Sequence, residues 1–244
     1  MNILGINCFS HDTSACLLKD GQIIAFAEEE RFNREKHTRD FPDRAIKFCL
    51  DEAGIEIDEV DYLGFPFRPG LDLSRGLVDF VQGFPWSYRR FVGQLIFDAA
   101  LFKKVFDFKS KYGYQKKIIF VGHHETHCAS SFFVSPFEEA AILSIDRGGD
   151  YLSTYLAAGR GNDFQVVKYI KNPNSLGSVY TTVTSYLGFK PNSDEGKVMG
   201  LAPYGRPTYL ADFQNLIHLD NDGAFKINLS YFTYHRLGGY GVSQ

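Results

Sequence analysis

The chain has 244 residues, enough to bury a sizeable hydrophobic core in one large domain or two smaller lobes. Its formal net charge of -3 and sequence pI of about 6.2 provide no basic field, which argues against nucleic acid and anionic membranes as partners. No apolar run reaches the roughly 18 residues of a membrane span, and neither a signal peptide nor a CxxC pair is evident, so we expect a cytoplasmic protein with reduced cysteines.

The chain begins with a predicted β-hairpin. Strands are expected at residues 1–8 and 15–18, and Asp20-Gly21 predicts a tight turn into a third strand at 22–27. The loop at 10–14 crowds hydrogen-bond donors and acceptors between the first two strands. Such a loop can contact a phosphate or a transferring group, or it can be an ordinary polar turn. The residues of this loop leave both interpretations open.

A charged segment and two helical patterns follow the hairpin. The charged run at 28–37 is typical of a solvated face, but because it directly follows a strand, some of its members can line a cleft. A helix is then predicted with Pro42 in its first turn and Gly54 at its end. After a predicted strand at 61–66, a helical pattern covers residues 72–112.

The central part of the chain predicts a metal site. A predicted buried strand at 118–121 leads into a helix in which His123 and His127 lie four residues apart, and therefore on one face. This spacing suits two imidazoles that share one metal ion, although such a pair can also simply cap a helix over a polar pocket. A further apolar strand, 140–146, ends in Asp146, where an oxygen ligand for a His-bound divalent ion is expected.

The region after His127 repeats the start of the chain faintly. Predicted strands at 143–146, 151–157 and 164–170 follow the same order of strand, polar loop, strand, turn and strand. Aligning Asn7 with Asp146 also aligns Ser14 with Ser153, which supports this match. The repeat predicts a duplicated fold of two similar halves, with ligands held in the cleft between facing hairpins.

The last third predicts a helix followed by a glycine-rich segment. Ser175 is the predicted N-cap, and Gly188 is the predicted end of the helix. Its apolar residues share one face: Leu176, Val179, Tyr180, Val183, Tyr186 and Leu187. In the segment 189–205, Glu195 and Lys197 offer charge on a flexible backbone that can approach a ligand closely. This segment is not a Walker loop, because GxxxxGK[ST] is absent.

The tail predicts a short helix at 207–216 and a turn between two strands at 221–224. Residues 237–244 have neither a helix cap nor a strand ending, so we expect the chain to stop within a domain.

Five stretches together resemble the O-carbamoyltransferases of nodulation-factor synthesis and antibiotic tailoring. They are Leu4-Gly-Ile-Asn7 with His11-Asp-Thr-Ser-Ala15, Glu29–His37, His123–His127, Ser144–Asp146 and Asp194–Gly205. The resemblance implies an α/β fold with a duplicated ribonuclease-H-like architecture of the actin and hexokinase type. A first half would cover 1–136, with a helical insertion at 72–112. Residues 137–244 would form the beginning of a second, incomplete half. The remainder of that half and an adenylate-forming C-terminal domain would lie beyond residue 244.

The resemblance also implies a reaction. The full-length protein would make carbamoyl-adenylate from ATP and carbamoyl phosphate, and would move the carbamoyl group to a hydroxyl of a small acceptor. Iron(II) would be the divalent metal on His123, His127 and Asp146. His11 would be the general base, because an imidazole has a pKa near neutrality, and Asp12 would orient it. Substrate binding would fall to Arg31, Lys36, Glu195 and Lys197.

One departure and two alternatives accompany this reading. Arg147 stands where the family usually has glycine, which puts the phosphate-side contacts of that loop in doubt. The chain could instead be a metal- and ligand-binding module that is inactive alone. A sugar kinase or another ATPase of the same fold is the other alternative; it predicts a magnesium site, and the histidine pair argues against it because magnesium prefers oxygen ligands.

Overall fold

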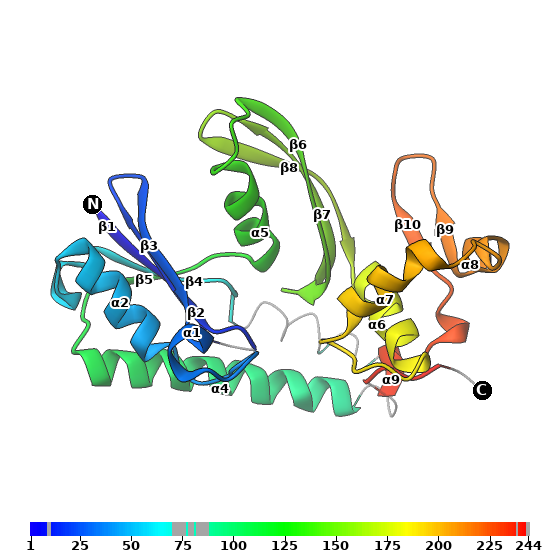
Figure 1. Ribbon diagram of the computed structural model, residues 1–244, viewed down its shortest axis with the longest axis horizontal. Helices are drawn as coiled ribbons and strands as arrows, with labels where there is room; N and C mark the ends of the chain where they lie inside the picture. The colour runs from blue at the N-terminus through cyan, green and yellow to red at the C-terminus, as the bar shows by residue number, and fades with distance from the viewer. Residues whose placement is uncertain (9–10, 70–76, 78–80, 82–87, 238, 243–244) are drawn as a thin grey trace. The chain divides into compact units, whose positions relative to one another are not determined.

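The structure is a computed structural model that describes every residue except 9–10, 70–76, 78–80, 82–87, 238 and 243–244 (Figure 1). The chain forms two compact units. The first comprises Met1–Gly70 with Leu95–His123, and the second comprises Leu71–Gln94 with His124–Gln244. The boundary predicted after residue 136 differs from this division, because nearly all of the histidine-rich helix belongs to the second unit. The assignment of the units to two halves of one actin-like domain stays a prediction.

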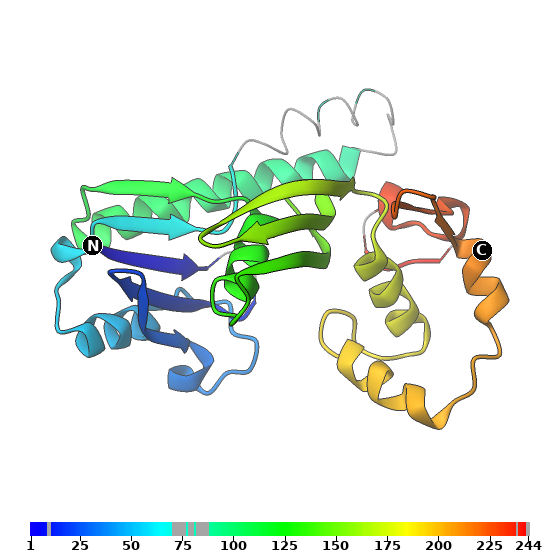
Figure 2. The same ribbon diagram turned by 90° about the horizontal axis from the view of Figure 1, so that it is seen from above.

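The described strands of the first unit form a mixed sheet with the order β3-β2-β1-β4-β5 (Figure 2). They are β1 (Asn2–Asn7), β2 (Ser14–Lys19), β3 (Gln22–Glu28), β4 (Tyr62–Phe65) and β5 (Lys117–Phe120). The first three pair antiparallel, while β4 runs parallel to both β1 and β5. The predicted hairpin is confirmed, and Gly21 in its turn has the positive φ of 83° that favours glycine. Because Asn7 pairs with Ser14, the polar loop between them lies at one end of the sheet.

Two helices contribute to the hydrophobic core beside this sheet: α2 (Asp43–Ala53) and α4 (Tyr88–Tyr112). Alternate strand residues such as Leu4 and Leu17 pack with Ile46 and Phe108. As predicted, α2 follows Pro42 and ends at Gly54. Of the predicted helical pattern 72–112, α4 confirms the part from Tyr88 onward, and most of the part before it lies outside the described residues. The short α1 (Glu30–Asn33) and η1 (Ile57–Glu59) complete the unit.

Charged residues in the run 28–37 also organise this core. The Glu29 side chain is buried, and its carboxylate accepts a hydrogen bond from the backbone N–H of Ala45 at 2.9 Å. An acidic group at this place satisfies a donor that the first turn of a helix leaves open, and it complements the helix dipole. Glu29 therefore fixes the start of α2.

Strand β5 was predicted to be buried, but it is partly exposed. It lies at the edge of the sheet, and the side chains of Lys117 and Ile119 are exposed. An edge position leaves one side of a strand unpaired, so an apolar run does not by itself decide burial.

The second unit contains an antiparallel sheet made of β6 (Glu139–Gly149), β7 (Leu152–Arg160) and β8 (Asp163–Lys171), with α5 (His123–Phe132) beside it (Figure 1). The predicted repeat of strand, turn and strand is present. A Cβ atom on Gly159 would lie only 2.6 Å from the ring of Phe132, so glycine lets the end of α5 pack against β7. Strand β6 continues beyond its predicted end at Asp146, but its pairing with β7 is irregular between Ile145 and Gly149.

Helix α6 (Leu176–Tyr186) has the predicted cap, since Ser175 Oγ accepts a hydrogen bond from the N–H of Ser178 at 2.9 Å. Its predicted apolar face is only partly confirmed. Val179 is buried and Leu176 packs beside it, but Tyr180, Tyr186 and Leu187 are exposed, whereas Ser178 and its hydroxyl-bearing neighbours are buried. The buried hydroxyl residues are Ser178, Thr181, Thr182 and Thr184. The physical reason is close packing, because a Cβ atom on Gly177 would lie 2.5 Å from the backbone nitrogen of Arg147, and small side chains permit such an approach.

The segment 189–205 was predicted to have a flexible backbone, but part of it is helical. It contains α7 (Glu195–Leu201) and η2 (Ala202–Tyr204), so Glu195 and Lys197 lie on a short helix. The turn at 221–224 is confirmed between two short strands. The remaining elements are α8 (Leu210–Leu216), β9 (Ile217–Leu219), β10 (Phe225–Ile227), η3 (Leu229–Tyr231) and α9 (Tyr234–Leu237).

Strands packed with helices in both units confirm the predicted α/β class. All four cysteines are free thiols, as predicted. Within the described ranges, none of the helices combines the length and hydropathy that crossing a bilayer requires.

Candidate functional site

Helix α5 is anchored to its sheet by one stripe of side chains. His124, Cys128 and Phe132 are each four residues apart, and all three are buried. His124 Nδ1 lies 2.8 Å from the hydroxyl of Ser144 on β6, and its ring stacks on Tyr155 of β7 at a centroid distance of 6.0 Å. The orientation of α5 against β6 and β7 is therefore fixed by a polar contact as well as by packing.

The next stripe of α5 carries the predicted metal ligands. One ligand atom each from His123, His127 and Asp146 lies within 4.8 Å of the others. His127 Nε2 is 3.7 Å from Asp146 Oδ2, which is too far for a hydrogen bond. Two atoms that are each about 2.1 Å from a tetrahedral ion lie roughly 3.4 Å apart, so this spacing fits a shared divalent ion. Two imidazoles and a carboxylate suit a transition metal.

Asp146 is held in place by hydrogen bonds from Arg147 and Ser175. The N–H of Arg147 donates to Asp146 Oδ1 at 2.6 Å. The single hydroxyl proton of Ser175 is shared between the carbonyl oxygens of Arg147 at 2.9 Å and Asp146 at 3.2 Å. Ser175 is also the N-cap of α6. The start of α6 thus orients the proposed oxygen ligand, in the irregular part of β6 where regular pairing with β7 does not hold it.

Arg147, the departure from the family pattern, has partners within its own unit. Its guanidinium donates to Asn192 Oδ1 and to the hydroxyl of Tyr240, each at 3.2 Å, and it lies over the Tyr240 ring at 5.2 Å. These contacts show where the bulk and charge of Arg147 are accommodated. Its effect on a phosphate stays a prediction.

The hairpin loop brings His11 and Asp12 together. A third residue, His37, also contacts Asp12, and we did not predict it. Asp12 Oδ2 lies 2.5 Å from His11 Nδ1, and Asp12 Oδ1 lies 2.8 Å from His37 Nδ1. Burial by itself would raise the pKa of Asp12, but hydrogen bonds from the two histidines lower it below its usual value. All three side chains are partly exposed, so solutes can reach this group.

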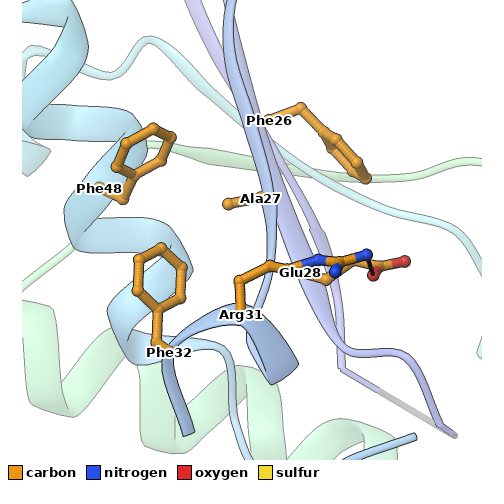
Figure 3. A pocket seen from close by; sticks show the side chains of 6 residues that line it. All are labelled: Phe26, Ala27, Glu28, Arg31, Phe32 and Phe48. Carbon is orange, nitrogen blue, oxygen red and sulfur yellow. Dashed lines mark hydrogen bonds and ion pairs between the residues drawn. The ribbon is translucent and has the colours of Figure 1, made fainter. Parts of the chain in front are cut away.

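The first two predicted substrate-binding residues lie in the same unit as this loop. Arg31 forms ion pairs with Glu28 at 3.5 Å and Glu30 at 3.8 Å, and it lines a shallow hollow with Phe32 and Phe48 (Figure 3). Figure 3 places the two phenyl rings on one side of the hollow and the Arg31–Glu28 pair on the other. Lys36 is exposed.

The other two lie in the second unit and make local contacts. Glu195 Oε1 accepts a hydrogen bond from the N–H of Asn192 at 2.7 Å, and Lys197 Nζ forms an ion pair with Asp194 at 2.7 Å. The hydrogen bond from Lys197 lowers the pKa of Asp194. Both residues therefore stabilise the turn before α7 and the start of that helix, and a role in binding stays a prediction.

Comparison with known proteins gives the family. Residues 2–237 match the family described as Carbamoyltransferase N-terminus. An uncharacterized protein of Synechocystis is 41% identical over 245 residues, covering 96% of this chain and 40% of that protein. The nodulation protein NolNO of Sinorhizobium fredii is 37% identical over 228 residues, covering 91% of this chain and 32% of that protein.

Solved structures also match, at low identity. The ROK hexokinase from Thermus thermophilus has a TM-score of 0.41 and 13% identity, with 86% of this chain and 72% of that chain covered. YeaZ from Pseudomonas aeruginosa has a TM-score of 0.36 and 14% identity, with 71% and 68% covered. The chain spans two fifths or less of the length of the two curated relatives named above. The match over residues 2–237 shows that this chain belongs to the Carbamoyltransferase N-terminus family.

Proposed function

We propose that this chain is the N-terminal portion of a metal-dependent O-carbamoyltransferase. The whole protein would move a carbamoyl group from carbamoyl-adenylate, made from ATP and carbamoyl phosphate, to a hydroxyl of a small acceptor. The observation that carries this proposal is the spacing of His123, His127 and Asp146 in a chain of this family.

A divalent ion bound there, for which we propose iron(II), would act as a Lewis acid on a carbonyl or phosphoryl oxygen. The chain's own residues would hold the ligands in place. His124 anchors α5 through Ser144, and Ser175 holds the backbone at Asp146 and Arg147. The proposed ligand side chains of His127 and Asp146 remain 48% and 34% exposed, which leaves room for a substrate to approach.

His11 would take the proton of the acceptor hydroxyl. Its Nδ1 faces Asp12, so its Nε2 is the nitrogen that can accept this proton. General base catalysis by a positioned imidazole typically contributes about 10²- to 10⁴-fold in rate. The exposure of the histidine supports this role, because the acceptor must reach it from solvent.

Cationic and acidic side chains would bind the substrates. Arg31 is 71% exposed and its carboxylate partners lie at 3.5 and 3.8 Å, so a phosphate could replace them. We propose the same role for Lys36. Glu195 and Lys197 would bind polar groups of the substrate from α7, next to the turn that they stabilise.

The test uses the full-length protein with iron(II), ATP, carbamoyl phosphate and a panel of hydroxylated acceptors, with carbamoylated product detected by mass spectrometry. We expect product from the unchanged protein. Replacing His127 with alanine should remove both the bound metal and the product. The matched control is His218→Ala, which changes an exposed histidine on β9. No product from the unchanged protein with any acceptor, or full metal content in the His127 variant, would contradict the proposal.

A second candidate is a binding module that turns nothing over alone. It is favoured by the small share of the relatives that the chain spans, 40% and 32%. In that case the isolated chain should bind the metal ion and yet give no product when carbamoyl-adenylate is supplied directly.

A further inference from the structure

His37 reaches the hairpin loop that carries His11 and Asp12 from a different part of the chain. Its ring comes from the segment after α1, 25 residues beyond Asp12. Asp12 thus joins two imidazoles, with one carboxylate oxygen for each. The two N···O distances, 2.5 and 2.8 Å, are those of direct hydrogen bonds. They are shorter than the roughly 3.4 Å between two ligand atoms on one tetrahedral ion, so Asp12 shares a proton with each histidine in this structure.

The charge of Asp12 decides which nitrogens carry protons. Its lowered pKa keeps the carboxylate ionised at neutral pH, and an ionised carboxylate can only accept hydrogen bonds. Nδ1 of His11 and Nδ1 of His37 must therefore both be donors. In neutral His11, the lone pair is then on Nε2, the nitrogen that faces away from Asp12.

Further contacts hold both ends of this arrangement. Asp12 has a φ of 58° and His37 a φ of 57°, a left-handed conformation that costs energy for residues other than glycine. The side-chain amide of Asn7 donates to the carbonyl oxygen of Asp12 at 3.1 Å. The backbone N–H of His37 donates to Glu30 Oε2 at 3.1 Å. The loop and the segment after α1 are thereby tied to each other through Asp12.

We infer that His37 is a positioning residue for the transfer step: by donating to Asp12, it holds the carboxylate that keeps the Nε2 of His11 free as the base. This inference rests on the proposed function. In the step, the acceptor oxygen bonds to the carbamoyl carbon and its proton goes to Nε2 of His11. The bond from that carbon to the phosphate oxygen breaks, and its electron pair leaves with AMP.

Two substitutions distinguish the role of the His37 side chain from that of its left-handed backbone conformation. Glycine and asparagine both tolerate a left-handed φ, but only asparagine keeps an N–H donor near the place of Nδ1. The pair His37→Gly and His37→Asn therefore differs in the hydrogen bond to Asp12. Glu35→Gln is the control, because it removes a charge two residues away on an exposed side chain.

The measurement is ¹⁵N NMR of the full protein labelled only in its histidines, with His11 assigned from a His11→Gln spectrum. In the unchanged protein, in Glu35→Gln and in His37→Asn, neutral His11 should be mostly the tautomer protonated on Nδ1. His37→Gly should shift it to a mixture of tautomers and lower kcat at least tenfold, with KM within twofold.

Three results would overturn the inference: an unchanged His11 tautomer in His37→Gly, a tautomer protonated on Nε2 in the unchanged protein, or a His11 signal that zinc addition shows to be metal-bound at Nδ1. The tautomer does not depend on turnover. A protein that shows the expected tautomers but makes no product would therefore refute the proposed function and leave the hydrogen-bond arrangement in place.

Discussion

Replacing Gly177 with alanine should move the oxygen ligand of the proposed metal site. The added Cβ would lie 2.5 Å from the backbone nitrogen of Arg147 and 2.7 Å from the carbonyl carbon of Asp146. Ordinary contacts of this kind are about 3.4 Å or longer, so α6 and β6 would have to separate by several tenths of an ångström. Because the atoms in contact are backbone atoms, no side-chain rotation can relieve the clash.

Overpacking costs about 1–3 kcal/mol, and a clash with three backbone atoms at 2.5–2.8 Å places this substitution in the upper part of that range, at about 2–3 kcal/mol. The better helix propensity of alanine offsets about 1 kcal/mol of it. We therefore expect a net loss of about 1–2 kcal/mol, or a Tm lower by roughly 2–8 °C for a chain of this size. Displacement of Asp146 should also weaken metal binding by about tenfold or more, as is typical when the groups that orient a ligand are disturbed.

The assay is thermal unfolding followed by circular dichroism, together with metal titration by calorimetry. Gly196→Ala is the matched control: Gly196 also lies in a helix, its Cβ would meet nothing within 4 Å, and it should stabilise the protein slightly. If Gly177→Ala keeps both the Tm and the metal affinity of the unchanged protein, α6 does not hold Asp146 in the way described.

Other predictions concern the anchors of the two units. Ser144→Ala removes the hydrogen bond to His124 Nδ1, so the free energy of unfolding in urea should fall by about 1 kcal/mol; an unchanged urea midpoint would show that packing alone orients α5. Burial, and to a smaller extent the nearby Cys16, raises the pKa of the Cys49 thiol to about 11. Because the folded pKa lies above the unfolded value, the stability that this thiol contributes is present below the unfolded pKa and is lost as the pH rises from about 9 to about 11. Cys49→Ala should reduce that loss in urea unfolding measured across the same pH range, and an identical pH dependence would count against burial as the cause.

Local signals in the sequence predicted much of the fold. The turn at Asp20-Gly21, the glycine that ends α2 and the serine that caps α6 are each decided by a few neighbouring residues. The same holds for the two histidines four residues apart, because helix geometry alone places them on one face. Features of this kind need no knowledge of the rest of the molecule.

Features that depend on distant parts of the chain were missed. The charged run 28–37 gave no sign that Glu29 caps α2 or that His37 meets Asp12, because both contacts join separate segments. The predicted apolar face of α6 was partly wrong for a similar reason, since the approach of Gly177 to β6 selects small hydroxyl side chains over the apolar ones. Spacing identifies a face, but only the packing partner decides whether that face is buried.

The central claim is that His123, His127 and Asp146 bind one metal ion. An anomalous-difference map at the iron absorption edge, from crystals of the protein grown with iron(II), tests it most directly. A single strong peak between the two imidazoles and the carboxylate is the predicted result. A map with no peak there, or with its iron peak at other side chains, would contradict the claim.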